Sequence, residues 1–195
     1  MQTVCPKRDL AEEIKLAADF ITKQLPHIKD CKVVMVLGSG LGPFTKNLEN
    51  QKVLKYSTIP NWKESTVKGH SGQLVLGNLI GNADCFVMIM QGRLHSYEGY
   101  SYFDQTFPIR VFHELGIKNM IITNACGSVN PEYDVSDIML ISDHISFMAG
   151  NPLIGMPFKP QFVDMADAYS KSLRVQFKKI AAKKDIGVHE GVYVA

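Results

Sequence analysis

Lys-Val-Val-Met-Val-Leu-Gly-Ser-Gly-Leu-Gly, residues 32–42, is the stretch around which the chain is organised. Five consecutive apolar residues, 33–37, predict a strand that is buried on both faces. Gly38, Gly40 and Gly42 follow, and glycines let the backbone turn sharply and approach a ligand closely. The segment after them can open a helix whose free N–H groups favour an anion. The stretch therefore predicts an anion site, with a plain strand-to-helix turn as the alternative.

Other nucleotide-binding loops fit this stretch poorly. In a dinucleotide fingerprint the third glycine would come one residue later, where this chain has Pro43. A strand ending in a ribose-binding acid is also missing at the expected spacing. A Walker loop is excluded because no Gly-Lys-Ser/Thr follows the glycines. The loop is typical of phosphate binding but not of ATP or NAD binding.

The length, charge and cysteine content of the chain set modest limits on what it can be. The 195 residues suit one domain, 1–195, and 21 basic residues balance 19 acidic ones. This charge gives no indication of a nucleic-acid or membrane partner. The four cysteines are far apart, and neither a signal-peptide core nor an apolar run of membrane-spanning length is present. We expect a cytoplasmic protein in a reducing compartment.

Hydrophobic periodicity predicts an α/β fold. Helices are expected over 9–25, 103–115 and 164–184, the last with a buried stripe of Leu173, Phe177, Ile180 and Ala181. Further strands are expected over 53–56, 73–79, 83–90, 118–123, 137–142 and 188–195, those over 85–90 and 118–123 being buried. A loop without periodicity over 145–160 is expected to be a lid or an interface segment.

The richest segment follows the strand that ends at Met90, where residues 91–100 read Gln-Gly-Arg-Leu-His-Ser-Tyr-Glu-Gly-Tyr. Ligands in open α/β sheets lie beyond the carboxyl ends of strands. Arg93 offers a planar fork that suits phosphate, and His95 and Tyr97 point the same way in an extended loop. We rank this functional interpretation above a solvated loop whose charges pair with one another.

Two other segments bear on the site. Residues 124–130 form a small-residue loop after a strand, and its backbone N–H groups suit an anion. Cys126 in that loop is expected to be a buried small residue and not a nucleophile, since no base is identifiable beside it. His70, between Gly69 and Gly72, is a surface or a ligand-contacting residue. Together these loops favour binding of free phosphate over acid–base hydrolysis, because no carboxylate pair is in evidence.

Five segments of the sequence, taken in order, resemble the sequence of one known protein family. Val34 to Gly42 looks like the opening strand and phosphate loop of the trimeric purine nucleoside phosphorylases. Four later segments are similar to further blocks of that family in the same order, namely residues 65–72, 90–100, 123–125 and 137–144. The Gly-Arg-x-His-x-Tyr-Glu-Gly block is specific. The related methylthioadenosine phosphorylases share the fold and the phosphate site, but their version of this block differs.

The resemblance implies a central mixed β-sheet flanked by helices and a reversible phosphorolysis of purine nucleosides, such as inosine or guanosine, in purine salvage. Phosphate would be a co-substrate, no metal or organic cofactor would be used, and the chain would form a homotrimer. The matching phosphate positions are Ser39, His70, Arg93, Leu94, His95 and the backbone of Ala125, with Arg93 and His95 as the catalytic pair. The matching nucleoside positions are Tyr97, Phe162 and Tyr193.

Two departures from the family pattern shape the expectations. Cys126-Gly127-Ser128 stands where the family usually has Ala-Gly-Gly, and the Ser128 side chain is expected to tighten that turn. The chain also stops within an apolar run, so we expect the domain to be incomplete at its C-terminus. A catalytically impaired relative that acts as a binding or regulatory protein, a methylthioadenosine phosphorylase-like enzyme and a dehydrogenase-like nucleotide-binding domain are the alternatives.

Overall fold

The computed structural model describes residues 9–38, 40–67 and 71–195. The chain divides into two compact units, residues 1–125 and residues 126–195, which are called the first and the second unit below. That residues 1–195 form one domain stays a prediction.

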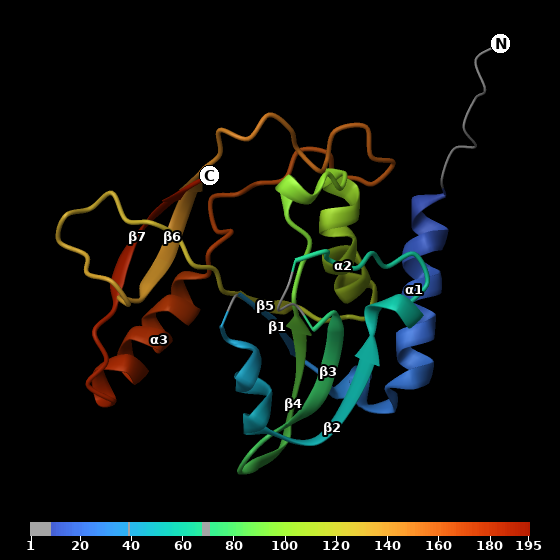
Figure 1. The fold of residues 1–195 in the computed structure, drawn as a ribbon, viewed down its shortest axis with the longest axis horizontal. Helices are drawn as coiled ribbons and strands as arrows, with labels where there is room; N and C mark the ends of the chain where they lie inside the picture. The colour runs from blue at the N-terminus through green and yellow to red at the C-terminus, as the bar shows by residue number, and fades with distance from the viewer. Residues whose placement is uncertain (1–8, 39, 68–70) are drawn as a thin grey trace. The chain divides into compact units, whose positions relative to one another are not determined.

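A five-stranded mixed sheet forms the centre of the first unit (Figure 1). The strands lie in the order β2-β3-β4-β1-β5, with β1 parallel to both β4 and β5, whereas β2, β3 and β4 form an antiparallel meander. This confirms the predicted α/β class with a central mixed sheet. The bounds are Val33–Leu37 for β1, Leu48–Lys55 for β2, Gln73–Leu79 for β3, Asn82–Gln91 for β4 and Asn119–Ile122 for β5.

Strand β1 lies between two neighbours, as its run of five apolar residues predicted. Val34, Val36 and Leu37 are buried, and Leu37 belongs to a core cluster with residues of β2, β3 and β4. Val33 and Met35, which alternate with Val34 and Val36 along the strand, are partly buried, so neither face of β1 is fully exposed to solvent. The apolar run thus places the glycine loop at the carboxyl end of a central strand.

Two helices flank the sheet of the first unit. Helix α1, Leu10–Gln24, begins where Asp9 Oδ1 accepts a hydrogen bond from the Glu12 backbone N–H at 3.1 Å, as a capping residue does. Helix α2, Tyr102–Glu114, contacts α1 and continues through Pro108 (Figure 1). Both helices were predicted to within a few residues. Short 3₁₀ turns η1 to η4 cover Pro26–Asp30, Gly42–Asn47, Tyr56–Thr58 and Ser96–Glu98.

The predicted burial of strand 118–123 is wrong. Strand β5 pairs with β1 on one side and is an edge of the sheet, and the side chains of Ile121 and Ile122 are exposed. An apolar run identifies a strand but does not say whether both of its neighbours are present.

The second unit is a parallel pair of strands with one helix. Strands β6, Met139–Ile145, and β7, His189–Val194, pair from Met139 and His189 onward, with one register shift between Ile141 and Asp143. Helix α3, Lys171–Lys183, begins later than predicted, because residues 164–170 form bends and turns in which the Asp164 carboxylate accepts the Ala166 N–H at 2.9 Å. Short polar side chains offer the backbone such alternatives to a helix.

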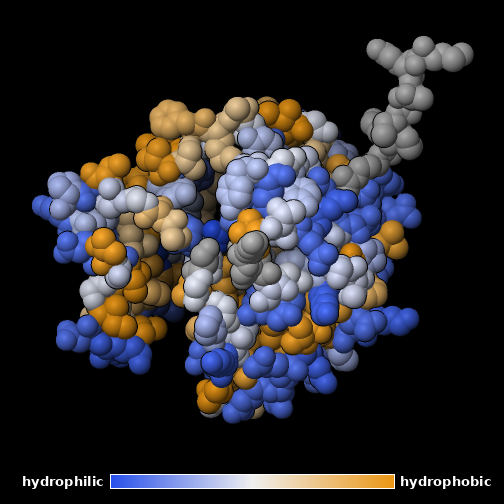
Figure 2. Space-filling view, viewed as in Figure 1, coloured by the Kyte–Doolittle hydropathy of each residue, from blue (hydrophilic) through white to orange (hydrophobic). Residues whose placement is uncertain are grey.

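The predicted buried stripe of α3 is also wrong. Leu173, Phe177 and Ile180 are between 44% and 56% exposed, and only Ala181 is buried. A two-stranded sheet covers too little surface to bury the apolar face of a helix of this length. Figure 2 accordingly shows hydrophobic side chains at the surface of the second unit on the face in view.

Candidate functional site

The carboxyl ends of three parallel strands share one edge of the sheet in the first unit. Leu37 at the end of β1 pairs with Gln91 at the end of β4, and Val36 pairs with Ile122 at the end of β5. The loops that follow these residues therefore begin side by side. They are the segments in which the sequence predicted Ser39, Arg93, His95 and Ala125 as phosphate residues.

Thr123 directly follows β5. It forms hydrogen bonds with the loop after β1 and with the loop after β4. Its backbone carbonyl accepts a hydrogen bond from Arg93 Nη1 at 2.6 Å. Its Oγ1 accepts the Gly38 backbone N–H at 2.7 Å. A Cβ at residue 38 would lie 2.9 Å from the same carbonyl oxygen, so only glycine fits this approach. The guanidinium of Arg93 is thereby held beside the start of the glycine loop.

Gln91 fixes the far end of the glycine loop. Its Nε2 donates to the Gly42 carbonyl at 3.0 Å, and its Oε1 accepts from Gln73 Nε2 at 2.7 Å. The side chain is buried, so these bonds replace those that water would otherwise make. Sequence reasoning missed this role, although a glutamine that directly follows an apolar strand was a usable signal.

Tyr56 holds the loop after β4 from another direction. The buried phenol donates to the Gly92 carbonyl at 2.9 Å, and burial raises its pKa, so it stays a neutral donor. The backbone of Tyr56 also donates to the Gly72 carbonyl at 2.9 Å. Tyr56 was missed as well, because a tyrosine at the end of a strand looks like ordinary core.

His95 is oriented by Glu98. The Glu98 Oε1 lies 3.2 Å from His95 Nδ1 and accepts the His95 backbone N–H at 2.7 Å. Burial by itself would raise the pKa of Glu98, but hydrogen bonds from the Thr66 and His95 backbones and the Thr66 and Ser65 hydroxyls outweigh it and lower the pKa to about 2. The carboxylate therefore stays charged and can only accept from His95 Nδ1, which directs Nε2 away from Glu98.

Tyr97 stacks on His95, as the period-two spacing of the loop suggested. The ring centroids are 5.0 Å apart and the planes are inclined by 13°. The Tyr97 side chain is 76% exposed and leaves one face and the hydroxyl open to solvent. Leu94 between Arg93 and His95 is half-buried. The arrangement joins a cation, an imidazole and an aromatic ring along one loop.

Of the three remaining predicted phosphate residues, only Ala125 lies in the described part of the chain. Ala125 is exposed, two residues after Thr123. Ser39 and His70 lie outside the described residues. Their assignment to phosphate stays a prediction, as do the roles of the other site residues.

Two of the predicted nucleoside residues, Phe162 and Tyr193, belong to the second unit. Tyr193 lines a hollow of about 770 Å³ together with residues of 126–139 and of β7. This volume is in the range of small-molecule sites. Phe162 is 92% exposed in the long connection between β6 and α3.

The loop at 126–130 differs from expectation at one residue. Cys126 is exposed, so the predicted buried role is wrong; the loop runs over the surface of the second unit instead of entering a core. Ser128 Oγ accepts the Asn130 backbone N–H at 3.0 Å and donates to the Asn130 carbonyl at 3.1 Å. The hydroxyl thus closes the turn locally, in the way expected for a side chain at that position.

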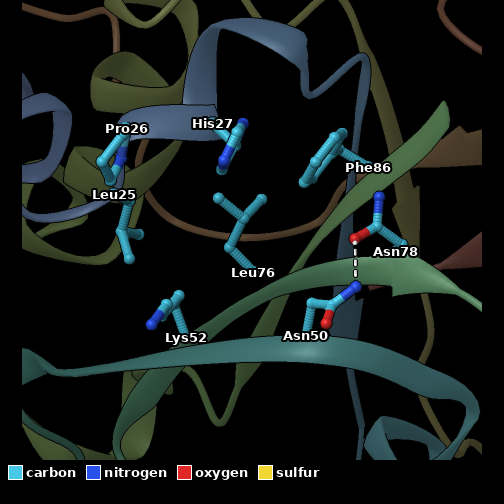
Figure 3. Close-up of a pocket in the computed structure, with 8 residues that line it drawn as sticks. All are labelled: Leu25, Pro26, His27, Asn50, Lys52, Leu76, Asn78 and Phe86. Atoms are coloured by element: carbon cyan, nitrogen blue, oxygen red, sulfur yellow. Dashed lines mark hydrogen bonds between the residues drawn. The ribbon is translucent and has the colours of Figure 1, made fainter. Parts of the chain in front are cut away.

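Another cavity, of about 280 Å³, lies in the first unit between η1 and strands β2, β3 and β4 (Figure 3). His27 stacks on Phe86 with ring centroids 5.0 Å apart, and Leu76 faces the space between them and Lys52. On one side of the cavity, Asn50 Nδ2 donates a hydrogen bond to Asn78 Oδ1 at 3.5 Å. The walls are mostly apolar, and the cavity contains none of the predicted site residues.

Among residues 9–38, 40–67 and 71–195, no group of three or more His, Cys, Asp or Glu side chains is arranged to hold a metal ion. The absence of a cofactor from the reaction stays a prediction. No helix in the described part of the chain is long and apolar enough to cross a membrane.

Comparison with known proteins identifies the family of the chain. A sequence profile of the phosphorylase superfamily matches residues 32–195. Purine nucleoside phosphorylase 1 of Bacillus subtilis is 47% identical over 189 residues, which cover 95% of this chain and 68% of that protein. The purine nucleoside phosphorylase of Mus musculus is 46% identical over 173 residues, which cover 84% of this chain and 58% of that protein.

A solved structure gives the same result. Isoform 2 of purine nucleoside phosphorylase from Schistosoma mansoni, in complex with cytosine and ribose-1-phosphate, superposes with a TM-score of 0.85 at 39% identity. The match covers 94% of this chain and 65% of that one, so the chain spans about two thirds of the relative's length. The profile, the identities and the common fold together show that the chain belongs to the purine nucleoside phosphorylase family of the phosphorylase superfamily.

Proposed function

We propose that the protein catalyses the reversible phosphorolysis of purine nucleosides to a free base and ribose 1-phosphate. The observation that carries the proposal is the pair of Arg93 and His95 at the carboxyl end of β4, with Arg93 bonded to Thr123 and His95 to Glu98. The relatives named above and the ribose-1-phosphate in the Schistosoma mansoni structure support it. We further propose a cytoplasmic homotrimer that acts in purine salvage.

Phosphate binding is the first step that these residues would perform. Arg93 supplies a fixed positive charge and a planar set of N–H donors for the phosphate oxygens. His95, with Nδ1 directed at Glu98, contributes its Nε2 side to the same anion. Ser39, His70, Leu94 and the backbone of Ala125 complete the proposed phosphate site.

Phosphorolysis then exchanges one bond at the sugar for another. The bond between C1′ and the base nitrogen lengthens and positive charge develops on the ribose. A phosphate oxygen forms the new bond to C1′ as the base leaves with the electron pair, and the proton that the hydrogen phosphate gives up is the one that the base gains overall. A phosphate dianion held beside C1′ stabilises that charge and is already in position to react. Tyr97, Phe162 and Tyr193 are proposed to contact the nucleoside.

Release of hypoxanthine from inosine, measured with and without phosphate, tests the proposal. We expect release that requires phosphate and that falls at least a hundredfold in Arg93→Ala. Lys15→Ala, which removes one positive charge from the exposed side of α1, is the matched control and should leave the rate unchanged. Release without phosphate, or an unchanged rate in Arg93→Ala, would contradict the proposal.

The choice of substrate is tested in the same assay. Inosine and guanosine should react faster than methylthioadenosine, since the block at 92–99 departs from that of the methylthioadenosine enzymes. A chain that binds phosphate but releases no base from any of these nucleosides would favour a role as a binding protein instead.

A further inference from the structure

Thr123 is bonded through three of its groups to other parts of the predicted phosphate site. The backbone N–H and the Oγ1 hydroxyl both donate to the Val36 carbonyl, at 3.0 Å and 3.1 Å. Oγ1 also accepts the Gly38 N–H at 2.7 Å, and the carbonyl accepts from Arg93 at 2.6 Å. One residue therefore joins the end of β1, the start of the glycine loop and the guanidinium of Arg93.

We propose that Thr123 is the positioning residue that sets the spacing between the glycine loop and Arg93 when phosphate binds. The inference rests on the phosphorylase activity proposed above, to which it adds a residue that has no direct contact with the anion. The hydroxyl fixes the direction of the Gly38 peptide, and the carbonyl fixes the plane of the guanidinium. The hydroxyl and the carbonyl belong to the same residue, so the glycine loop and Arg93 keep their spacing when either of them moves.

The hydroxyl has properties that few other groups share. It donates and accepts at once, which its two bonds to Val36 and Gly38 require. Because threonine is branched at Cβ, its χ1 angle is restricted, and the hydroxyl stays where the two partners need it. Valine has nearly the same shape but no hydroxyl, so it would leave the Gly38 N–H without its partner.

Gly38 itself positions the loop and does not bind the anion through its own N–H, since Thr123 Oγ1 already accepts that hydrogen. The close approach of the two residues is built into the backbone, because a Cβ on residue 38 would lie 2.9 Å from the Thr123 carbonyl oxygen. That oxygen is also the acceptor of the Arg93 bond. A shift at Gly38 is therefore transmitted to Arg93 through one residue, Thr123, whose hydroxyl accepts from Gly38 and whose carbonyl accepts from Arg93.

Steady-state kinetics of three variants tests the proposal, with phosphate varied at saturating inosine and inosine varied at saturating phosphate. Thr123→Val should raise the KM for phosphate about tenfold and leave the KM for inosine within a factor of two of the parent. Thr123→Ser keeps the hydroxyl and should restore the phosphate KM. Thr106→Val is the control, because its hydroxyl bonds only within α2, to Tyr102 and Phe103 carbonyls. Where Thr123→Val does not fold, Thr123→Ala replaces it in the same comparison.

Each outcome decides the matter. A phosphate-specific rise in KM that serine reverses supports the proposal. An active parent whose phosphate KM is unchanged in Thr123→Val, or whose two KM values rise together, overturns it while leaving the phosphorylase activity intact. A parent chain that neither binds phosphate in calorimetry nor releases base overturns the activity itself, and the inference with it.

Discussion

The Glu98 carboxylate holds both the ring and the backbone of His95: Oε1 lies 3.2 Å from Nδ1 and 2.7 Å from the backbone nitrogen. The other oxygen, Oε2, accepts the Thr66 backbone N–H at 2.6 Å and the Thr66 hydroxyl at 2.9 Å. Glu98 thus ties the loop at 65–67 to the loop after β4. The imidazole that we assign to phosphate binding is oriented by a buried charge.

Glu98→Gln should destabilise the fold and weaken phosphate binding. Donors face both carboxylate oxygens, so the amide NH₂ of glutamine must point at one set of them. We expect the free energy of unfolding at pH 7 to fall by about 2 kcal/mol, as for a lost hydrogen bond to a charged group. Urea unfolding followed by circular dichroism measures the change. Glu114→Gln at the end of α2 is a matched control, and an equal loss there would contradict the assignment.

The same carboxylate predicts a pH dependence of stability. The folded-state pKa of Glu98 is about 2, below the value of about 4.3 for a glutamate in an unfolded chain. As the pH falls, the unfolded chain takes up the proton first, so this stabilisation is complete above about pH 4.3 and is lost on the way to about pH 2. The stability difference between the parent and Glu98→Gln should therefore shrink across that window. A difference that stays constant down to pH 2.5 would speak against it.

Gly38→Ala adds only one methyl group but should lower both the stability of the fold and the affinity of the site for phosphate. The added Cβ would lie 2.9 Å from the Thr123 carbonyl oxygen, and backbone must move to relieve the contact. We expect a loss of about 2 kcal/mol in stability and a weaker affinity for inorganic phosphate in calorimetry. Gly187→Ala has open space around its Cβ and should change neither quantity. Equal effects of the two substitutions would refute the prediction.

Tyr56→Phe isolates the bond between Tyr56 and Gly92. The substitution keeps the buried ring and leaves the Gly92 carbonyl without the 2.9 Å hydrogen bond. The expected loss is about 1–2 kcal/mol in the free energy of unfolding. Tyr102→Phe, on α2, serves as the comparison. Urea denaturation of the three proteins decides the prediction, which fails if Tyr56→Phe unfolds at the parent's midpoint.

Tyr97 is expected to affect catalysis but not stability. Its side chain is 76% exposed, so Tyr97→Ala should change the free energy of unfolding by less than about 0.5 kcal/mol. Loss of the ring that stacks on His95 should raise the KM for inosine several-fold. Tyr97→Phe keeps the stack and should retain most of the affinity. Kinetics of both variants measure the contrast, and an unchanged KM in Tyr97→Ala would remove Tyr97 from the site.

Local physical rules in the sequence predicted most of the first unit. The apolar run at 33–37 and the Asp9 cap of α1 each depend on neighbours within a few residues, and both are observed. The loop with Arg93 and His95 was predicted as a phosphate site because its residue types suit phosphate, and that role stays a prediction. Thr123 and Gln91 were not found, since their partners lie far away in the chain and only the fold brings them together.

The wrong predictions concern the burial of β5, α3 and Cys126 and the start of α3, and each depends on contacts that the local sequence pattern does not report. The exposure of β5 and of the apolar face of α3 depends on what packs against them, which periodicity does not report. The early start predicted for α3 ignored the competition of Asp164 for backbone N–H groups. Cys126 was expected to be buried because of its residue type, whereas its place in a surface loop decides its exposure.

The strand order of the first unit has a consequence for the order of folding. A tight hairpin joins β3 to β4, and residues 56–72 join β2 to β3, whereas β1 pairs with β4 and β5 across longer stretches of chain. Closing long loops costs more entropy and slows the formation of such contacts. The glycine loop and Arg93 should therefore come together late, after the meander has formed. Pulsed hydrogen-exchange labelling during refolding should find the amides of β3 protected before those of β1, so a slowly folding chain would show structure well before it gains the ability to bind phosphate.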